Sequence, residues 1–196
     1  MRLANLTFAI AISIGLAPSA SFSDSGSYLA ARSAIAASDY RAASEYFSRA
    51  LIRDPGNLVL LESAATAYVG LGDLDRATEI ARRMVSAGSS GQLGGLILTG
   101  SNAKAGAWDD LRAGFENGLA VGPLFDGLAK AWSLVGSGNM SVAIEAIDEL
   151  SGSTVVQAFG LYHKALALAS VGDFEGAAEI MSGGTGTELR LTRRGI

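Results

Sequence analysis

Apolar and small residues recur along this chain at the three- and four-residue spacing that places side chains on one face of an α-helix. The pattern is clearest over residues 40–53, where Ala43, Phe47 and Ala50 share one helical face. Asp39 precedes this stretch as a capping residue and Pro55 ends it, since proline cannot continue a helix. Prolines are few and strings of β-branched residues are rare, so the pattern predicts an all-α fold.

Each expected second helix follows a short turn of one form, in which a Gly or Ser comes before a polar or small residue and then an apolar one. The five turns are Ser38-Asp39-Tyr40, Gly72-Asp73-Leu74, Gly106-Ala107-Trp108, Gly138-Asn139-Met140 and Gly172-Asp173-Phe174. The intervals between them are equal, except that the interval from Gly106 to Gly138 is slightly shorter. Glycine suits the left-handed end of a helix, and Asp or Asn suits the cap of the next one. The turns therefore predict helix hairpins of one repeating length.

The period of about 34 residues and the positions of Ala43, Phe47, Ala50 and Pro55 resemble the tetratricopeptide repeat. The resemblance implies a right-handed superhelix, or α-solenoid, of about five helix hairpins. The expected repeats are residues 24–57, 58–91, 92–123, 124–157 and 158–191, and residues 192–196 begin an incomplete further helix. Repeat three departs most from the pattern, because Gly94, Gly95 and Gly100 lie inside its first helix. Either this helix is loose, or a neighbouring backbone presses against it.

Residues 1–23 have the layout of a secretory signal peptide. A positive start at Arg2 is followed by an uncharged apolar run over residues 3–16 and a tail of small residues. We expect cleavage after Ser23, or else after Ser21, and a periplasmic or secreted mature chain. An uncleaved membrane anchor and a buried core helix are the alternatives, and after cleavage we expect no stable membrane insertion.

Composition and charge narrow the function. Apolar residues make up 49% of the 196 residues and charged residues 17%, which indicates a folded chain. The formal net charge is -4, so we expect no nucleic-acid partner. The chain has no cysteine and one histidine, His163. We therefore expect no catalytic centre, no metal and no cofactor, and we interpret Gly183 to Gly186 as a helix stop rather than a phosphate loop.

The resemblance also implies a ligand-binding groove, because the first helix of each tetratricopeptide hairpin lines the concave surface. Carried over position by position, the expected partner-binding residues are Tyr28, Arg32, Glu62, Leu93, Leu96, Phe125, Leu128, Trp132, Phe159, Tyr162 and His163. Family members that grip acidic tails use basic residues and asparagines there, whereas these side chains are mostly apolar. The groove is therefore expected to bind an amphipathic helix or an apolar extended segment, or to be filled by more of the same chain.

The sequence thus predicts a non-catalytic protein-interaction scaffold with a protein or peptide partner. The alternative is a structural spacer, or the N-terminal part of a longer cell-envelope protein, with no ligand of its own. The apolar side of Ala177, Ile180 and Met181 has no further repeat to pack on. We expect it to be covered by a longer array, by a partner, or by self-association with a second copy.

Overall fold

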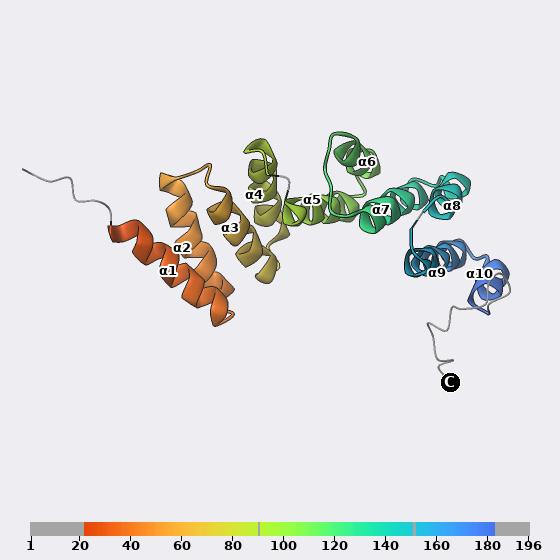
Figure 1. Ribbon diagram of the computed structural model, residues 1–196, viewed down its shortest axis with the longest axis horizontal. Coiled ribbons are helices and arrows are strands. Elements are labelled where there is room, and N and C mark those ends of the chain that lie inside the picture. Colours follow the sequence, from red (N-terminus) through yellow and green to blue (C-terminus); the bar gives the residue numbers. More distant parts are fainter. Residues whose placement is uncertain (1–21, 90, 151, 183–196) are drawn as a thin grey trace, which may run out of the picture.

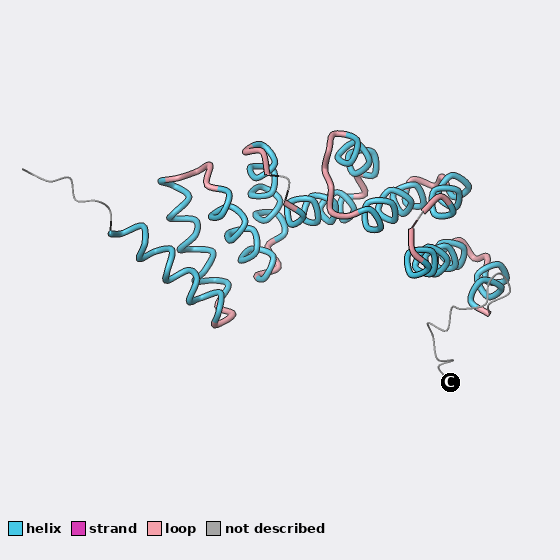
Figure 2. The backbone as a smooth tube through the Cα atoms, viewed as in Figure 1, coloured by secondary structure: helices cyan, strands magenta, loops and turns pink. Residues whose placement is uncertain are grey.

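The computed structural model describes residues 22–89, 91–150 and 152–182, which form ten helices and no strand. The helices follow one another as hairpins in an elongated row joined by short loops (Figures 1 and 2). They are α1 (Phe22–Ala36), α2 (Tyr40–Arg53), α3 (Leu58–Gly70), α4 (Leu74–Ser86), α5 (Gln92–Ala105), α6 (Trp108–Glu116), α7 (Pro123–Gly136), α8 (Met140–Asp148), α9 (Thr154–Ser170) and α10 (Phe174–Met181). The all-α prediction is confirmed for the described residues.

Two predicted segments lie outside the described residues: the signal peptide up to residue 21 and the C-terminal stretch from residue 183. The predicted cleavage after Ser23 lies in the first turn of α1, which begins at Phe22. The predicted helix over 40–53 matches α2. α7 and α9 begin at Pro123 and Thr154, shortly before the expected starts of their repeats. Within the described ranges, no helix combines the length and apolar character needed to cross a bilayer.

The turns between paired helices have the predicted left-handed backbone. Gly72 and Gly172 have φ of 73° and 87°, and Ser38 adopts φ of 58° although it carries a side chain. Three of the expected caps form, since Asp39, Asp73 and Asp173 each accept a hydrogen bond from a backbone N–H three residues later. The expected Asn139 cap is wrong, because that side chain makes no capping hydrogen bond to α8. Hairpins close through the same turn geometry whether or not the cap forms.

The buried side chains form two clusters along the row. The N-terminal core runs from α1 to α5 and is centred on Phe47, Leu61 and Met84, all nearly inaccessible. The C-terminal core joins α7, α8 and α9 through Ala131, Ile147 and Ala167. Small residues at these contacts let helix backbones approach closely, which is how each hairpin buries its apolar face on the next. The third hairpin, α5 and α6, links the two cores, because Ile97 of α5 belongs to the N-terminal core and α6 contacts α7.

At Gly95, a neighbouring segment does press against the first helix of the third hairpin. A Cβ atom on Gly95 would lie 2.7 Å from Val121 Cγ2 and 3.3 Å from the Ala120 carbonyl oxygen. The loop after α6 therefore presses on the first helix of the hairpin. Gly100, by contrast, has no atom within 4 Å of its Cβ position, and packing therefore does not require a glycine there.

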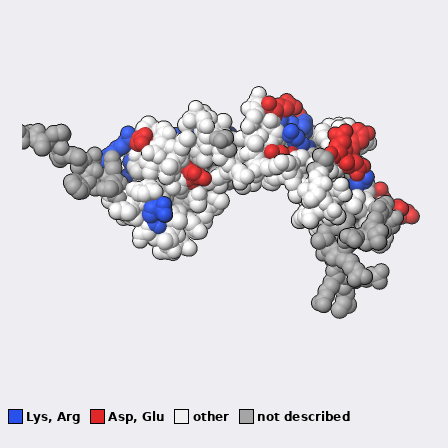
Figure 3. Space-filling view, viewed as in Figure 1, with Lys and Arg blue, Asp and Glu red and all other residues white. Residues whose placement is uncertain are grey.

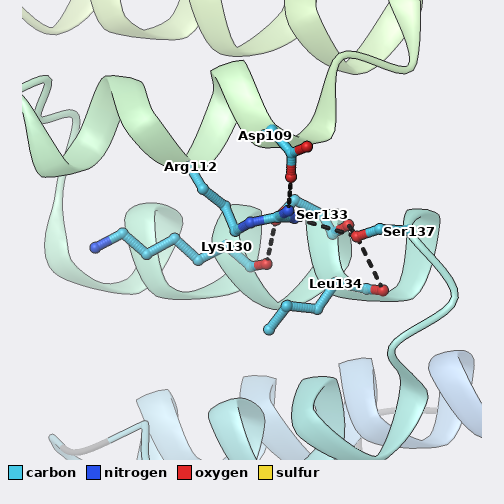
Figure 4. Close-up of polar contacts among 6 residues, drawn as sticks. All are labelled: Asp109, Arg112, Lys130, Ser133, Leu134 and Ser137. Carbon is cyan, nitrogen blue, oxygen red and sulfur yellow. Dashed lines mark hydrogen bonds and ion pairs between the residues drawn. The ribbon is translucent and has the colours of Figure 1, made fainter.

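Polar contacts fasten α6 to α7 (Figure 4), and one aromatic contact adds to them. The Arg112 guanidinium donates to Ser133 Oγ at 3.0 Å and to Ser137 Oγ at 3.2 Å, and it also pairs with Asp109. The Trp108 ring lies over Gly136, where a Cβ atom would clash with the indole. The α6–α7 junction is thus held by a half-buried, hydrogen-bonded arginine and by the Trp108 ring, beside the buried Leu111 and Phe115 of α6.

Candidate partner-binding surface

All of the predicted partner-binding residues lie on the first helices of the hairpins. α1 carries Tyr28 and Arg32, α3 carries Glu62, α5 carries Leu93 and Leu96, α7 carries Phe125, Leu128 and Trp132, and α9 carries Phe159, Tyr162 and His163. The helices α3 and α5 contact each other, as do α7 and α9, so the first helices meet within each of these two pairs. We refer to the surface made by these side chains as the inner surface.

At the C-terminal end of the inner surface, three of these side chains form one cluster. The Trp132 Nε1–H donates to His163 Nδ1 at 3.0 Å, and their rings meet edge to face at 6.1 Å. The Tyr162 ring packs against the same imidazole at 5.7 Å. Because His163 Nδ1 accepts the hydrogen bond, the proton of the neutral imidazole sits on Nε2. Burial lowers the pKa of His163 below 6.5, which favours this neutral form.

Next to this cluster, apolar side chains remain open to solvent. Phe125 is 37% exposed and Phe159 is 42% exposed, while Leu128 is half-buried. Leu96 on α5 is 43% exposed. Exposed apolar residues elsewhere, such as Ile52 and Phe174, are scattered among other helices. The part of the inner surface on α5, α7 and α9 can therefore bury apolar area against a partner without any change of backbone.

At the N-terminal end, the predicted residues serve the fold as well as the surface. Tyr28 packs edge to face on the buried Phe47 with ring centroids 6.3 Å apart, and its hydroxyl accepts from Arg32 at 3.2 Å. Leu93 is half-buried against the N-terminal core. Glu62 is exposed and its side chain makes no ion pair among the described residues. No described contact joins this group to the cluster at Trp132.

Sequence reasoning missed two clefts, each bordered by second helices. One, of about 480 Å³, is bordered by α2, the end of α3 and the start of α4, and three arginines line it. The other, of about 410 Å³, lies among α4, α5 and α6 and is lined by Leu98, Asn102 and Leu119, among others. The stripe Arg41, Ser44, Glu45, Ser48 and Arg49 on one face of α2 was the available signal for the first cleft.

Charged side chains gather on second helices. Figure 3 shows Asp and Glu over α8, where Glu145, Asp148 and Glu149 are exposed. Asp148 also joins α8 to α9, because Lys164 donates to both of its carboxylate oxygens at 2.6 and 2.8 Å. Arg83 on α4 donates to the Pro55 carbonyl at 2.8 Å. The described residues contain no group of histidines and carboxylates able to hold a metal ion.

Comparisons with known proteins agree with the repeat pattern. The model of the tetratricopeptide repeat matches residues 34–89. The tetratricopeptide repeat and J domain-containing co-chaperone DNJ1 of Fusarium oxysporum f. sp. lycopersici is 39% identical over 75 residues, which are 38% of this chain. That alignment spans only 14% of the co-chaperone, so its other parts have no counterpart in the alignment.

Solved structures resemble a larger share of the chain. A crystal structure of MamA protein has a TM-score of 0.64 at 16% identity, covering 87% of this chain and 98% of that one. YrrB, described as a TPR protein with an unusual peptide-binding site, has a TM-score of 0.60 at 14% identity, covering 78% and 79%. At these identities the likeness concerns the fold alone. Residues 34–89 thus match the tetratricopeptide repeat family, and the solved structures share the fold over most of the chain.

Proposed function

We propose that this chain is a non-catalytic scaffold that binds an amphipathic helix or an apolar extended segment of a protein on its inner surface. The observation that carries the proposal is the exposure of Leu96, Phe125 and Phe159 on three successive first helices, α5, α7 and α9. A partner that covers these side chains removes apolar area from water, and aromatic side chains in such a surface dominate binding energy.

The chemistry of the inner surface selects an apolar partner over an acidic one. Its α7 and α9 portion offers phenyl, indole and aliphatic groups, and the single imidazole is kept neutral by burial and by the Trp132 hydrogen bond. Because no cation is among these side chains, nothing would offset the cost of removing a carboxylate from water. An amphipathic helix matches this portion, because the apolar face of such a helix can cover exposed side chains such as Phe125 and Phe159.

A pull-down from an extract of the source organism tests the proposal with matched variants. Phe125 and Phe159 are the residues to replace, because both are exposed and neither belongs to a buried core, so F125A/F159A should keep the fold. The control is E145A/E149A on α8, where exposed charges contribute little. We expect the wild type and the control to retain one specific protein and the groove variant to lose it. Equal retention by all three proteins would place the ligand elsewhere.

The alternative is a structural spacer with no ligand of its own. A spacer would retain no specific protein in the same pull-down, with either variant or with the wild type. A defined probe separates the two cases further: a neutral helical peptide with leucine on one face and glutamine on the other. Binding of this peptide to the wild type and not to F125A/F159A would support the groove; no binding together with an empty pull-down would favour the spacer.

We further propose export to the periplasm or the medium, and self-association through α10. Export rests on the layout of residues 1–23, and intact-mass measurement of the secreted chain should give a new N-terminus near Asp24.

Self-association rests on Phe174, which is 70% exposed. Tyr40 and Trp108 occupy the same place in earlier hairpins, and each covers a glycine of the following first helix. Light scattering should show association that Phe174→Ser abolishes; a wild type that stays monomeric refutes it.

A further inference from the structure

The cleft between α2 and the α3–α4 turn, which we call the outer cleft, has a surplus of hydrogen-bond donors. Arg41, Ser44, Glu45, Ser48 and Arg49 of α2 form one wall, and Leu71, Asp73 and Arg76 form the other, with Tyr68 between them. The outer cleft has a volume of about 480 Å³, which is within the range of sites that hold small ligands or short peptide segments.

The charges of the outer cleft do not cancel. Glu45 pairs with Arg49 at 3.4 Å and Asp73 pairs with Arg76 at 3.8 Å, each within its own helix end. Arg41 lines the same cleft, and its guanidinium has no hydrogen bond or ion pair among the described residues, although its backbone carbonyl accepts from Ser44 Oγ. Three guanidinium groups thus face two carboxylates, and one positive charge is left uncompensated.

The hydroxyl groups at the base of the cleft add one more unused donor. Ser48 Oγ and Tyr68 Oη lie 2.8 Å apart and share a single hydrogen bond, and Arg76 donates to Tyr68 Oη at 3.4 Å. Each hydroxyl has one hydrogen, so whichever of the two donates, the hydrogen of the other has no acceptor in the described part of the chain. Tyr68 is only 7% exposed and lines the outer cleft together with Ser48.

From this geometry we infer that the outer cleft binds an acidic peptide segment of a partner protein, with a side-chain carboxylate held by Arg41 and by the Ser48–Tyr68 hydroxyl pair. A carboxylate supplies the acceptors and the negative charge that the cleft lacks. Guanidinium–carboxylate contacts are charge-assisted and are the usual means by which acidic motifs are recognised. Leu71 offers an apolar contact for the stem of the bound side chain.

This site goes beyond the proposed function and does not depend on it. The inner surface takes apolar side chains through the first helices, whereas the outer cleft takes an anion through α2 and α4. A chain that uses both would hold two different segments, and each can be lost without the other.

Titration of the isotope-labelled full chain with a hexaglutamate peptide tests the inference by NMR. We expect chemical-shift changes confined to residues 41–49 and 68–76, affinity that falls as salt is added, and no binding of hexaglutamine. Arg41→Ala should weaken binding about tenfold, and Tyr68→Phe several-fold. The Arg41 guanidinium has no partner among the described residues, so its removal should leave the circular dichroism melting curve unchanged. The matched control is Arg82→Ala, an exposed arginine of α4 outside the outer cleft.

Several results would overturn the inference. These are the absence of binding, binding of hexaglutamine, shift changes that map elsewhere, or equal weakening by R41A and R82A. Inorganic phosphate provides a further arm. If phosphate displaces hexaglutamate at similar concentration, the outer cleft takes simple anions and the assignment to a peptide is wrong; if phosphate competes only weakly, the peptide assignment is supported.

Discussion

Two glycines of α5 should respond in opposite directions to the same substitution. Gly95 and Gly100 lie in the interior of one helix, and neither has a positive φ. Alanine at Gly100 would meet no atom within 4 Å, whereas alanine at Gly95 would place its Cβ 2.7 Å from Val121 Cγ2. The pair therefore separates helix propensity from packing within one element.

The magnitudes follow from those distances. Gly100→Ala should raise the free energy of unfolding by about 0.5–1 kcal/mol, because alanine is the better helix former. Gly95→Ala gains the same propensity but overpacks the contact with Val121, which costs about 1–3 kcal/mol. Val121 cannot retreat freely, since its N–H donates to Asp126 Oδ1 at 3.0 Å and the Ala120 carbonyl lies 3.3 Å from the new Cβ. The two variants should therefore differ by about 1–3 kcal/mol.

Urea denaturation followed by circular dichroism measures the difference, and hydrogen exchange of α5 and α6 shows where it arises. Exchange is needed because repeat arrays unfold in parts, so one global transition can hide a local change. We expect stronger protection of α5 in Gly100→Ala and weaker protection in Gly95→Ala. Equal stabilisation by both substitutions would refute the packing of Val121 on Gly95 and leave α5 as a loose helix.

Three further predictions concern single polar groups. Thr99 Oγ1 is buried without a hydrogen-bond partner among the described residues, so Thr99→Val should stabilise the chain by about 1–2 kcal/mol in urea denaturation. Arg112→Met removes the bonds to Ser133 and Ser137 and should destabilise the α6–α7 junction by about 1–2 kcal/mol, seen as faster hydrogen exchange of α6. The pKa of His163 is lowered by burial, so the unfolded chain takes up its proton first; stability should fall as pH drops below 6.5, and His163→Gln should reduce that fall in urea midpoints measured across this range. A Thr99→Val loss of stability, an unchanged α6, or an identical pH profile in His163→Gln would each contradict its own prediction.

Most of the helix order could be predicted from the sequence because its causes are local. The turn at Gly72 and Asp73 repeats around residues 38 and 172, and each copy specifies a left-handed residue followed by a side-chain cap. The face carrying Ala43 and Phe47 predicts which side of α2 is buried. Such signals depend only on neighbouring residues, and therefore they can be recognised before the packing is known.

The third hairpin could not be predicted in detail because its shape depends on contacts between distant segments. α6 ends at Glu116, and the loop that follows presses Val121 on Gly95, well before it in the chain. The shorter interval from Gly106 to Gly138 indicated that this repeat differs, but not that a loop replaces the end of its second helix. Arg112 bonding to α7 likewise depends on the angle at which the hairpins meet.

The sequence indicated which helices carry the candidate residues, but it did not predict the contacts that these side chains make. Phe125 and Phe159 lie on first helices as expected, yet only the structure shows that they are exposed while Tyr28 packs on the N-terminal core. The bond from Trp132 to His163 joins side chains from different helices, and the single histidine gave no sign of its partner. The outer cleft was missed because its donors come from α2, α3 and α4 together.

The central claim is that apolar side chains of α5, α7 and α9 bind a partner segment. Hydrogen exchange of the chain with and without the neutral leucine–glutamine peptide tests it most directly. The account predicts slower exchange in α7 and α9 on peptide addition, no change in α6 and α8, and no effect of the peptide on F125A/F159A. Protection confined to α2, α4 or α8, or equal protection in the double variant, would contradict it.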